Sequence, residues 1–161
     1  MMINQEFKSM SSRADGRYFT ALEAERIIKY GQGLRSRLST MQAIERAEPA
    51  ILAHVVEGVF RSIPELRPNR GSVFEEKVRR DTAHVLRYCA LSYVLLSREF
   101  LLDKLSVWYR TILCSVANPK NVMISLELLR EGIATNLSKT QFEGLVPYLD
   151  AHIEEFTVGV E

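Results

Sequence analysis

The chain has little cysteine, tryptophan and proline, with two, one and five of them among its 161 residues. Two cysteines in apolar helical patterns make no disulfide framework, and no zinc-site spacing is present. No apolar run reaches the roughly 18 residues of a membrane-spanning helix, and the first ten residues lack the order of a signal peptide. These absences predict a soluble, cytoplasmic protein with no metal site.

An excess of one charge is also missing, since 21 Lys and Arg face 20 Asp and Glu. A net charge of +1 gives no electrostatic basis for nucleic acid or an anionic membrane as the main partner, and near-neutral proteins self-associate readily. The 47% hydrophobic content is enough for one core. We expect one domain over residues 1–161.

Apolar residues recur at helical spacing through most of the chain, and sustained alternation with period two is hard to find. This pattern predicts an all-α fold of about seven helices, the size of a globin bundle, and no repeat indicates a solenoid. After a short leading helix and a polar turn at residues 11–17, the expected helices run over residues 20–45, 49–63, 73–96 and 100–116, then from residue 119 and from residue 138.

Local signals set these helix boundaries. Thr20 and Glu23 have the spacing of a capping box, and Ser138 is expected to cap the final helix. Pro49 suits the first turn of a helix, where its missing N–H costs little. The strongest loop signal is the run of residues 64–72, which contains two prolines and a glycine.

Several segments, in order along nearly the whole chain, are similar to phycobiliprotein subunits, especially the allophycocyanin β-type. They are Ala14–Phe19, Phe60–Pro68, Arg80-Asp81, Leu86–Tyr88, Leu102–Lys104, Pro119 and Tyr148–Asp150. The resemblance implies a globin-like helical fold with a short N-terminal helical extension that serves association. It also implies pairing with a second subunit and assembly into rings within the phycobilisome.

Subunits of that family attach a linear tetrapyrrole, or bilin, to the cysteine of a Cys-x-Arg-Asp pattern. This chain has Val78 in that position, and valine has no nucleophilic sulfur. Cys89 is eleven residues further on, roughly 16 Å along a helix, and cannot replace it. Cys89 and Cys114 are expected to be buried thiols. A pigment is therefore either absent or held noncovalently.

Asp81 and Arg80 match the family positions that accept the inner pyrrole N–H groups and bind the propionates. A buried carboxylate beside a protonated bilin makes a charge-assisted hydrogen bond. The alternative is that both residues only occupy the first turns of a helix, with Asp81 favoured by the dipole and Arg80 on a solvated face.

Other positions of the implied pigment site are changed. Val73 and Phe74 stand where the β-type has paired arginines, which leaves Lys77, with Arg79 as a further candidate, to bind propionates. His84 replaces a tyrosine and reads as a hydrogen-bond partner or axial ligand of a tetrapyrrole, or as an ordinary partly exposed histidine.

Two aromatic residues of the following helix, Trp108 and Tyr109, stand where family aromatics close the pocket. They are expected to stack on a pigment, with ordinary core packing as the alternative.

The resemblance also implies an ion pair across subunits between Asp15 and Arg87, with Tyr18 and Tyr88 beside them. Residues 3–10 would add apolar contact. The alternative is that Asp15 belongs to a turn and Arg87 to a solvated helix face. We expect a dimer or larger assembly with another phycobiliprotein-like subunit or with itself.

The leading hypothesis is a divergent allophycocyanin-like phycobilisome component, pigment-free or holding a noncovalent bilin of the phycocyanobilin type, that acts in antenna assembly or energy transfer at the cytoplasmic face of thylakoid membranes. The alternatives are a globin-like sensor or carrier of bilin or haem, and a pigment-free regulatory protein of the phycobilisome. An enzyme is not expected, because no catalytic constellation of residues is visible.

Overall fold

Helices make up nearly all of the computed structural model, which describes residues 5–158 except the side chains of residues 5, 6, 114 and 116. The elements are α1 (Gln5–Arg13), α2 (Ala21–Ser62), the 3₁₀ helix η1 (Pro64–Asn69), α3 (Val73–Leu95), α4 (Arg98–Leu101), the π-helical turn η2 (Leu102–Ser106), α5 (Val107–Val116), α6 (Pro119–Asn136) and α7 (Lys139–Thr157). No strand occurs within residues 5–158, so the all-α prediction is confirmed.

α2 is one continuous helix of 42 residues, with Pro49 inside it. The prediction of two helices, the second opening at Pro49, is wrong. A proline in a helix interior removes one hydrogen bond and costs about 3 kcal/mol. The apolar stripe that follows it, with Ile51, Val55 and Val59 buried, packs in the core. This burial outweighs the local cost, so the helix continues through the proline.

The predicted helix starts are otherwise confirmed where a side chain caps the helix. Thr20 and Glu23 form the expected capping box, and Ser138 forms another with Gln141. Asn118 caps α6 directly before Pro119.

Two local predictions need correction. Residues 64–72 are not a plain loop, because η1 occupies most of them. The helix expected from residue 100 begins at Arg98, since the Ser97 hydroxyl accepts a hydrogen bond from the Phe100 N–H at 3.2 Å, and it passes through η2 before α5.

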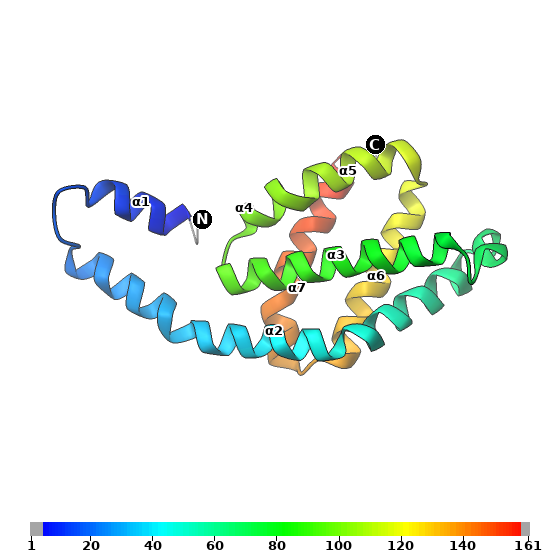
Figure 1. Ribbon diagram of the computed structural model, residues 1–161, viewed down its shortest axis with the longest axis horizontal. Helices are drawn as coiled ribbons and strands as arrows, with labels where there is room; N and C mark the ends of the chain where they lie inside the picture. Colours follow the sequence, from blue (N-terminus) through cyan, green and yellow to red (C-terminus); the bar gives the residue numbers. More distant parts are fainter. Residues whose placement is uncertain (1–4, 159–161) are drawn as a thin grey trace.

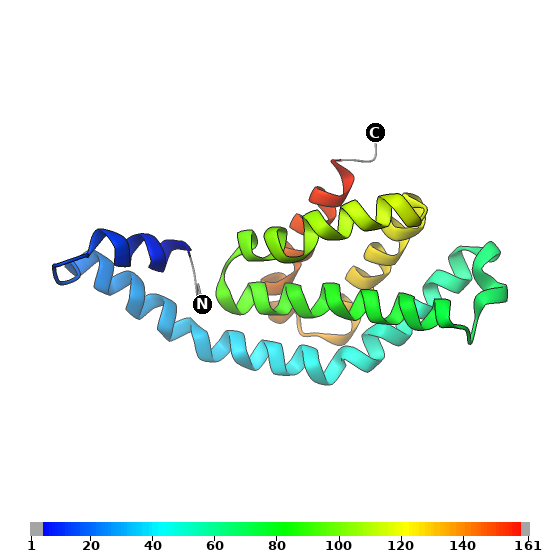
Figure 2. The same ribbon diagram turned by 45° about the horizontal axis from the view of Figure 1, so that its top comes forward.

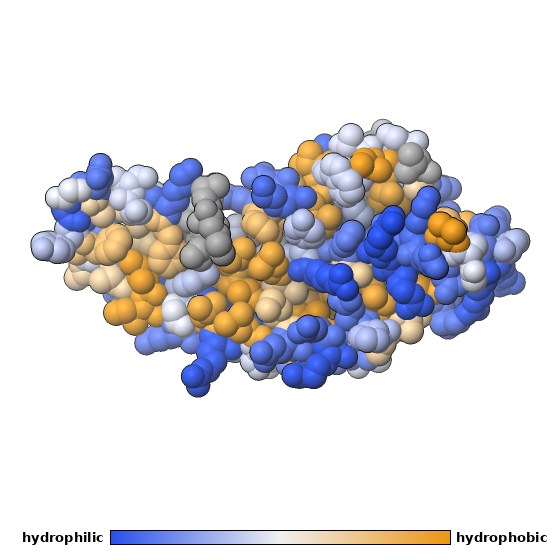
Figure 3. Space-filling model, in the orientation of Figure 1, coloured by the Kyte–Doolittle hydropathy of each residue, from blue (hydrophilic) through white to orange (hydrophobic). Residues whose placement is uncertain are grey.

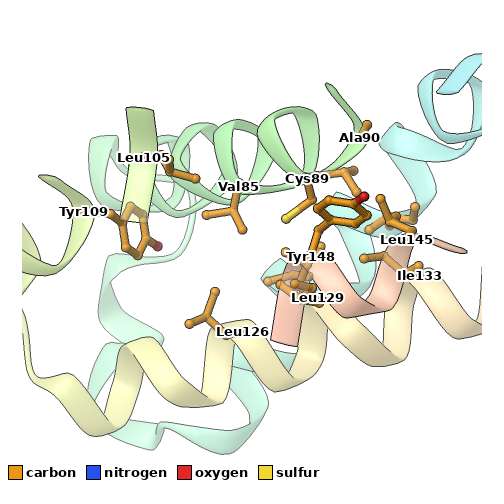
Figure 4. Packing of buried hydrophobic residues seen from close by; sticks show 14 of the residues in the cluster. Val85, Cys89, Ala90, Leu105, Tyr109, Leu126, Leu129, Ile133, Leu145 and Tyr148 are labelled. Carbon is orange, nitrogen blue, oxygen red and sulfur yellow. The ribbon is translucent and has the colours of Figure 1, made fainter. Parts of the chain in front are cut away.

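The body of the molecule has a globin-like arrangement, in which α6 and α7 lie across α2 and α3 (Figures 1 and 2). Figure 4 shows Val85 and Cys89 of α3 pointing toward Leu129 of α6 and Tyr148 of α7. Cys89 is buried as predicted. The side chain of Cys114 lies outside the described residues.

An arm, defined here as residues 5–36, extends from one end of this body (Figure 1). α1 folds back on α2, with Met10 buried and the Phe7 ring edge-on to Tyr30 at 4.8 Å between centroids. Met10 therefore packs within its own chain and is not available for contact with a partner, and Ile3 lies outside the described residues. The expected helical extension is confirmed.

Arg37 is a buried cation that connects α2 to the end of α3. Its Nε donates to the Val94 carbonyl at 2.9 Å and its Nη2 to the Tyr30 carbonyl at 3.0 Å, and its guanidinium lies 4.6 Å from the centre of the Tyr30 ring. The Val94 carbonyl is in the last turn of α3 and has no partner within that helix. Arg37 satisfies it and thereby holds the base of the arm against the body.

Replacing Arg37 by methionine is expected to lower the free energy of unfolding by about 2 kcal/mol, because the apolar stem is kept while a buried carbonyl loses its charged donor. Urea unfolding followed by circular dichroism measures this. Arg35→Met, at an exposed position on the same helix, is the matched control. Equal unfolding free energies for the two variants would contradict the role given to Arg37.

Candidate functional site

A cavity of about 400 Å³ lies between α3, α5 and α6, with one end closed by α2 and η1. This volume falls within the range of about 300–1,000 Å³ that is typical of small-molecule sites. Its lining residues are Val59, Ile63, Leu66, Phe74, Lys77, Val78, Asp81, Thr82, Tyr109, Leu113, Ala117, Asn118, Asn121, Val122 and Ser125. Most of these side chains are apolar, and the polar ones come mainly from two facing helices.

The α3 wall contains four of the predicted site residues, namely Phe74, Lys77, Val78 and Asp81. Their spacing of three and four residues places them on one face of the helix. Val78 packs against the core, and the Phe74 ring lies edge-on to Phe60 with 6.4 Å between centroids. The local periodicity of α3 thus brings the predicted residues together on one wall.

The Asp81 carboxylate lies at the edge of the cavity, where its side chain is 37% exposed. Its Oδ1 accepts a hydrogen bond from the Nε of Arg80 at 3.3 Å. Arg80 itself is not a lining residue, because it lies roughly 120° around α3 from the cavity face. Arg80 contacts Asp81 from the solvent side, and its role toward a ligand stays a prediction.

Two further predicted site residues, His84 and Trp108, lie outside the cavity wall. His84 is exposed and does not line the cavity, because it lies one helical turn beyond Asp81, past the end of the α3 wall. Trp108 is 57% exposed on the outer side of α5 and does not close the pocket. Only its neighbour Tyr109 points inward, since adjacent helical residues diverge by about 100°.

Tyr109 is buried and forms the inner wall between α3 and α6 (Figure 4). Burial raises the pKa of its phenol, and the negative charge of Asp81 raises it further. The hydroxyl therefore stays protonated and can donate a hydrogen bond into the cavity.

A wall that the sequence does not predict comes from the first turns of α6. Asn118, Asn121, Val122 and Ser125 share one helix face and line the cavity opposite α3. Their spacing marks a face, but no sequence signal says what that face opposes.

His152 lies behind Tyr109, with the two ring centroids 4.9 Å apart. It is fully buried, and its Nδ1 lies 2.8 Å from the Ser106 hydroxyl. Burial lowers the pKa of His152 to about 4, and its Nε2 has no hydrogen-bond partner among the described residues. The neutral imidazole is thus part of the packing that supports the inner wall.

The predicted interface residues lie away from the cavity. Asp15 is exposed in the turn after α1, and Tyr18 next to that turn is 97% exposed. Tyr88 is half-buried, with its ring 6.2 Å from that of Phe100. The Nε of Arg87 donates to Glu48 of the same chain at 3.0 Å.

A family model described as phycobilisome protein matches residues 11–156, which include α2 to α6 in full and nearly all of α7. The chain belongs to the phycobilisome protein family. This membership supports a light-harvesting phycobiliprotein role, and it covers every residue of the cavity. A search of curated proteins finds no match. Within residues 5–158, no helix of this phycobilisome protein has the length and apolar character to cross a membrane.

The buried His152 predicts a pH dependence of stability. The imidazole takes up a proton near pH 6.5 in the unfolded chain but only near pH 4 in the folded one, so stability falls as the pH drops through this window. Between pH 7 and pH 5 the wild type should lose about 2 kcal/mol more than His152→Asn. The asparagine does not titrate and keeps a polar group near Ser106.

Urea titrations of both proteins at the two pH values measure this difference, in which contributions from other titrating groups cancel. Parallel losses in the two proteins would show that His152 does not carry the effect.

Proposed function

We propose that this chain is an allophycocyanin-like subunit of the phycobilisome that holds a linear tetrapyrrole of the phycocyanobilin type without a covalent bond. The observation that carries the proposal is the cavity beside α3, whose wall contains Lys77, Val78 and Asp81 at the positions that the family resemblance assigns to pigment. Membership of the phycobilisome protein family supports it.

The chemistry of the cavity fits such a ligand. A linear tetrapyrrole is apolar over its conjugated plane and carries inner N–H groups and two carboxylates. The Asp81 carboxylate can accept from the N–H groups, and the Lys77 ammonium can bind a carboxylate. Tyr109 offers an aromatic face and a hydroxyl donor. The bound pigment would supply the absorption of visible light.

Val78 and Cys89 both support retention of the pigment without a covalent bond. Val78 offers only apolar contact. Cys89 is buried in the core, does not line the cavity, and has a thiol whose pKa is raised by burial, so it is neither reachable nor reactive.

The haem-binding alternative has little support from the structure, since His84, the residue considered as an axial ligand, lies outside the cavity wall. The other alternative is a pigment-free assembly or regulatory subunit. The coexpression experiment below distinguishes it from a pigment-binding subunit. In either case the chain acts in assembly or energy transfer and catalyses no reaction.

A surface groove supports the proposed assembly with a second subunit. It has a volume of about 470 Å³ and lies between α2 and α3, lined by Met41, Ile44, Glu45, Glu48, Pro49, Arg87 and Ala90. The tip of the arm exposes several apolar side chains, among them Tyr18, Phe19 and Leu22. Figure 3 shows hydrophobic surface gathered over the arm and the neighbouring end of the body.

We propose that the arm tip of one subunit, with Asp15 and Tyr18, docks beside Arg87 of another. Arg87 would then bind Asp15 in addition to its own Glu48, and the apolar arm residues would be covered. The partner is a second phycobiliprotein-like subunit or another copy of this chain, in an antenna complex at the cytoplasmic face of thylakoid membranes.

Coexpression with a bilin-producing pathway tests the pigment site. The wild type should be coloured on a native gel and colourless after denaturing electrophoresis, and Val78→Cys should keep its colour through denaturation. Asp81→Asn should bind at least about tenfold less pigment, because the charged acceptor is lost. Asp103→Asn, an exposed carboxylate outside the cavity, is the control.

Two results would contradict the pigment proposal. A wild type and a Val78→Cys variant that both stay colourless would indicate the pigment-free subunit. Colour that persists on the wild type after denaturation would mean covalent attachment elsewhere.

Sedimentation velocity tests the assembly, with the chain alone and mixed with phycobiliprotein subunits. Asp15→Ala and Arg87→Ala should each weaken association about tenfold, and the double variant should be no worse than either single one because both remove the same pair. Glu127→Ala, an exposed carboxylate on α6, is the control. A chain that stays monomeric at micromolar concentration, whether or not Asp15 is present, would rule out this interface.

A further inference from the structure

The α6 wall of the cavity offers one polar side chain whose hydrogen-bonding groups are open. The Asn118 Oδ1 already accepts from the Lys120 N–H at 3.0 Å, and the Ser125 hydroxyl donates to the Asn121 carbonyl at 3.0 Å. The Asn121 carboxamide lines the cavity and makes no hydrogen bond to any residue that the structure describes. It therefore presents both a carbonyl acceptor and an NH₂ donor to a ligand.

The acceptor and the donor of the Asn121 carboxamide determine which chemical group of a ligand can form hydrogen bonds with both of them. A carboxamide donates and accepts side by side, so its complement is a group with an adjacent N–H and C=O on one edge. A lactam ring has that edge, whereas a carboxylate only accepts and an ammonium only donates. Linear tetrapyrroles end in lactam rings at both termini. The closed macrocycle of haem has none.

We propose that Asn121 binds a terminal lactam ring of the bilin, accepting its N–H at Oδ1 and donating from Nδ2 to its carbonyl. This inference rests on the proposed pigment function and deepens it, because it assigns a second polar anchor on the wall opposite Asp81. The pairing makes the site selective for linear over cyclic tetrapyrroles.

The surroundings of Asn121 favour such an anchor. The neighbouring lining residues Val122, Leu113 and Ala117 are apolar, and hydrogen bonds in a site of low polarity contribute more than hydrogen bonds in water. Asp81 on α3 and Asn121 on α6 line the same cavity, together with apolar side chains. An elongated ligand with an apolar middle and polar groups at separate points fits this arrangement. Without a thioether at Val78, the amide pair would hold one end of the ligand in place.

Absorbance and fluorescence titration of the purified full chain with biliverdin, phycocyanobilin and haemin tests the proposal. Asn121→Leu, which keeps the size of the side chain but removes both hydrogen-bonding groups, should weaken binding of both bilins about tenfold. Its affinity for haemin should equal that of the wild type. Asn121→Asp keeps the acceptor without the donors and should also weaken bilin binding. Asn136→Leu, the same substitution at an exposed position of α6 outside the cavity, is the matched control and should leave the bilin affinities unchanged.

The outcomes separate the inference from the proposed function. If Asn121→Leu and Asn121→Asp bind both bilins as tightly as the wild type while Asp81→Asn binds them weakly, the lactam anchor is wrong and the pigment site stands. Equal losses for haemin and the bilins would overturn the selectivity for linear tetrapyrroles. If the wild type binds neither bilin, the pigment function and the anchor both fail.

Discussion

α2 and α6 cross at close range, and the rest of the body depends on this contact. A Cβ atom at Gly58 would lie 2.5 Å from the Cδ2 of Leu128, and one at Gly132 would lie 3.3 Å from the Cδ2 of His54. Glycine at these two positions lets the helices approach closely enough to bury Ile51 and Val55. That burial carries α2 through Pro49, sets the position of α6 relative to α3, and so creates the cavity between them.

The cavity and the arm lie toward opposite ends of α3. Arg37 ties the base of the arm to the end of α3. The cavity lies toward the other end of α3, where Val78 and Asp81 line its wall. The proposed pigment wall and the proposed interface lie on different faces of α3, because Arg87 lies on the groove side of this helix and Asp81 on the cavity side.

Helix ends were predictable where a neighbouring side chain forms hydrogen bonds with the free backbone groups at the end of the helix. Thr20 and Ser138 are such cases, because a capping box satisfies donors only a few residues away. Pro49 was not predictable, since its local cost is offset by packing against a helix that follows it by about 70 residues of sequence. The π-helical turn η2 likewise has no local signature in the sequence.

The candidate site also combines features that depend on neighbouring residues with features that depend on the packing of distant segments. The α3 wall could be predicted from the sequence, because a period of 3.6 residues places Lys77, Val78 and Asp81 on one face, for which the family resemblance implies pigment binding. The residues opposite this wall follow from the packing of the helices: Asn121 lines the cavity, whereas His84 and Trp108 do not. The reason is physical, since a helix fixes the relations of its own residues through local hydrogen bonds, whereas the partner of each face depends on the close packing of distant segments.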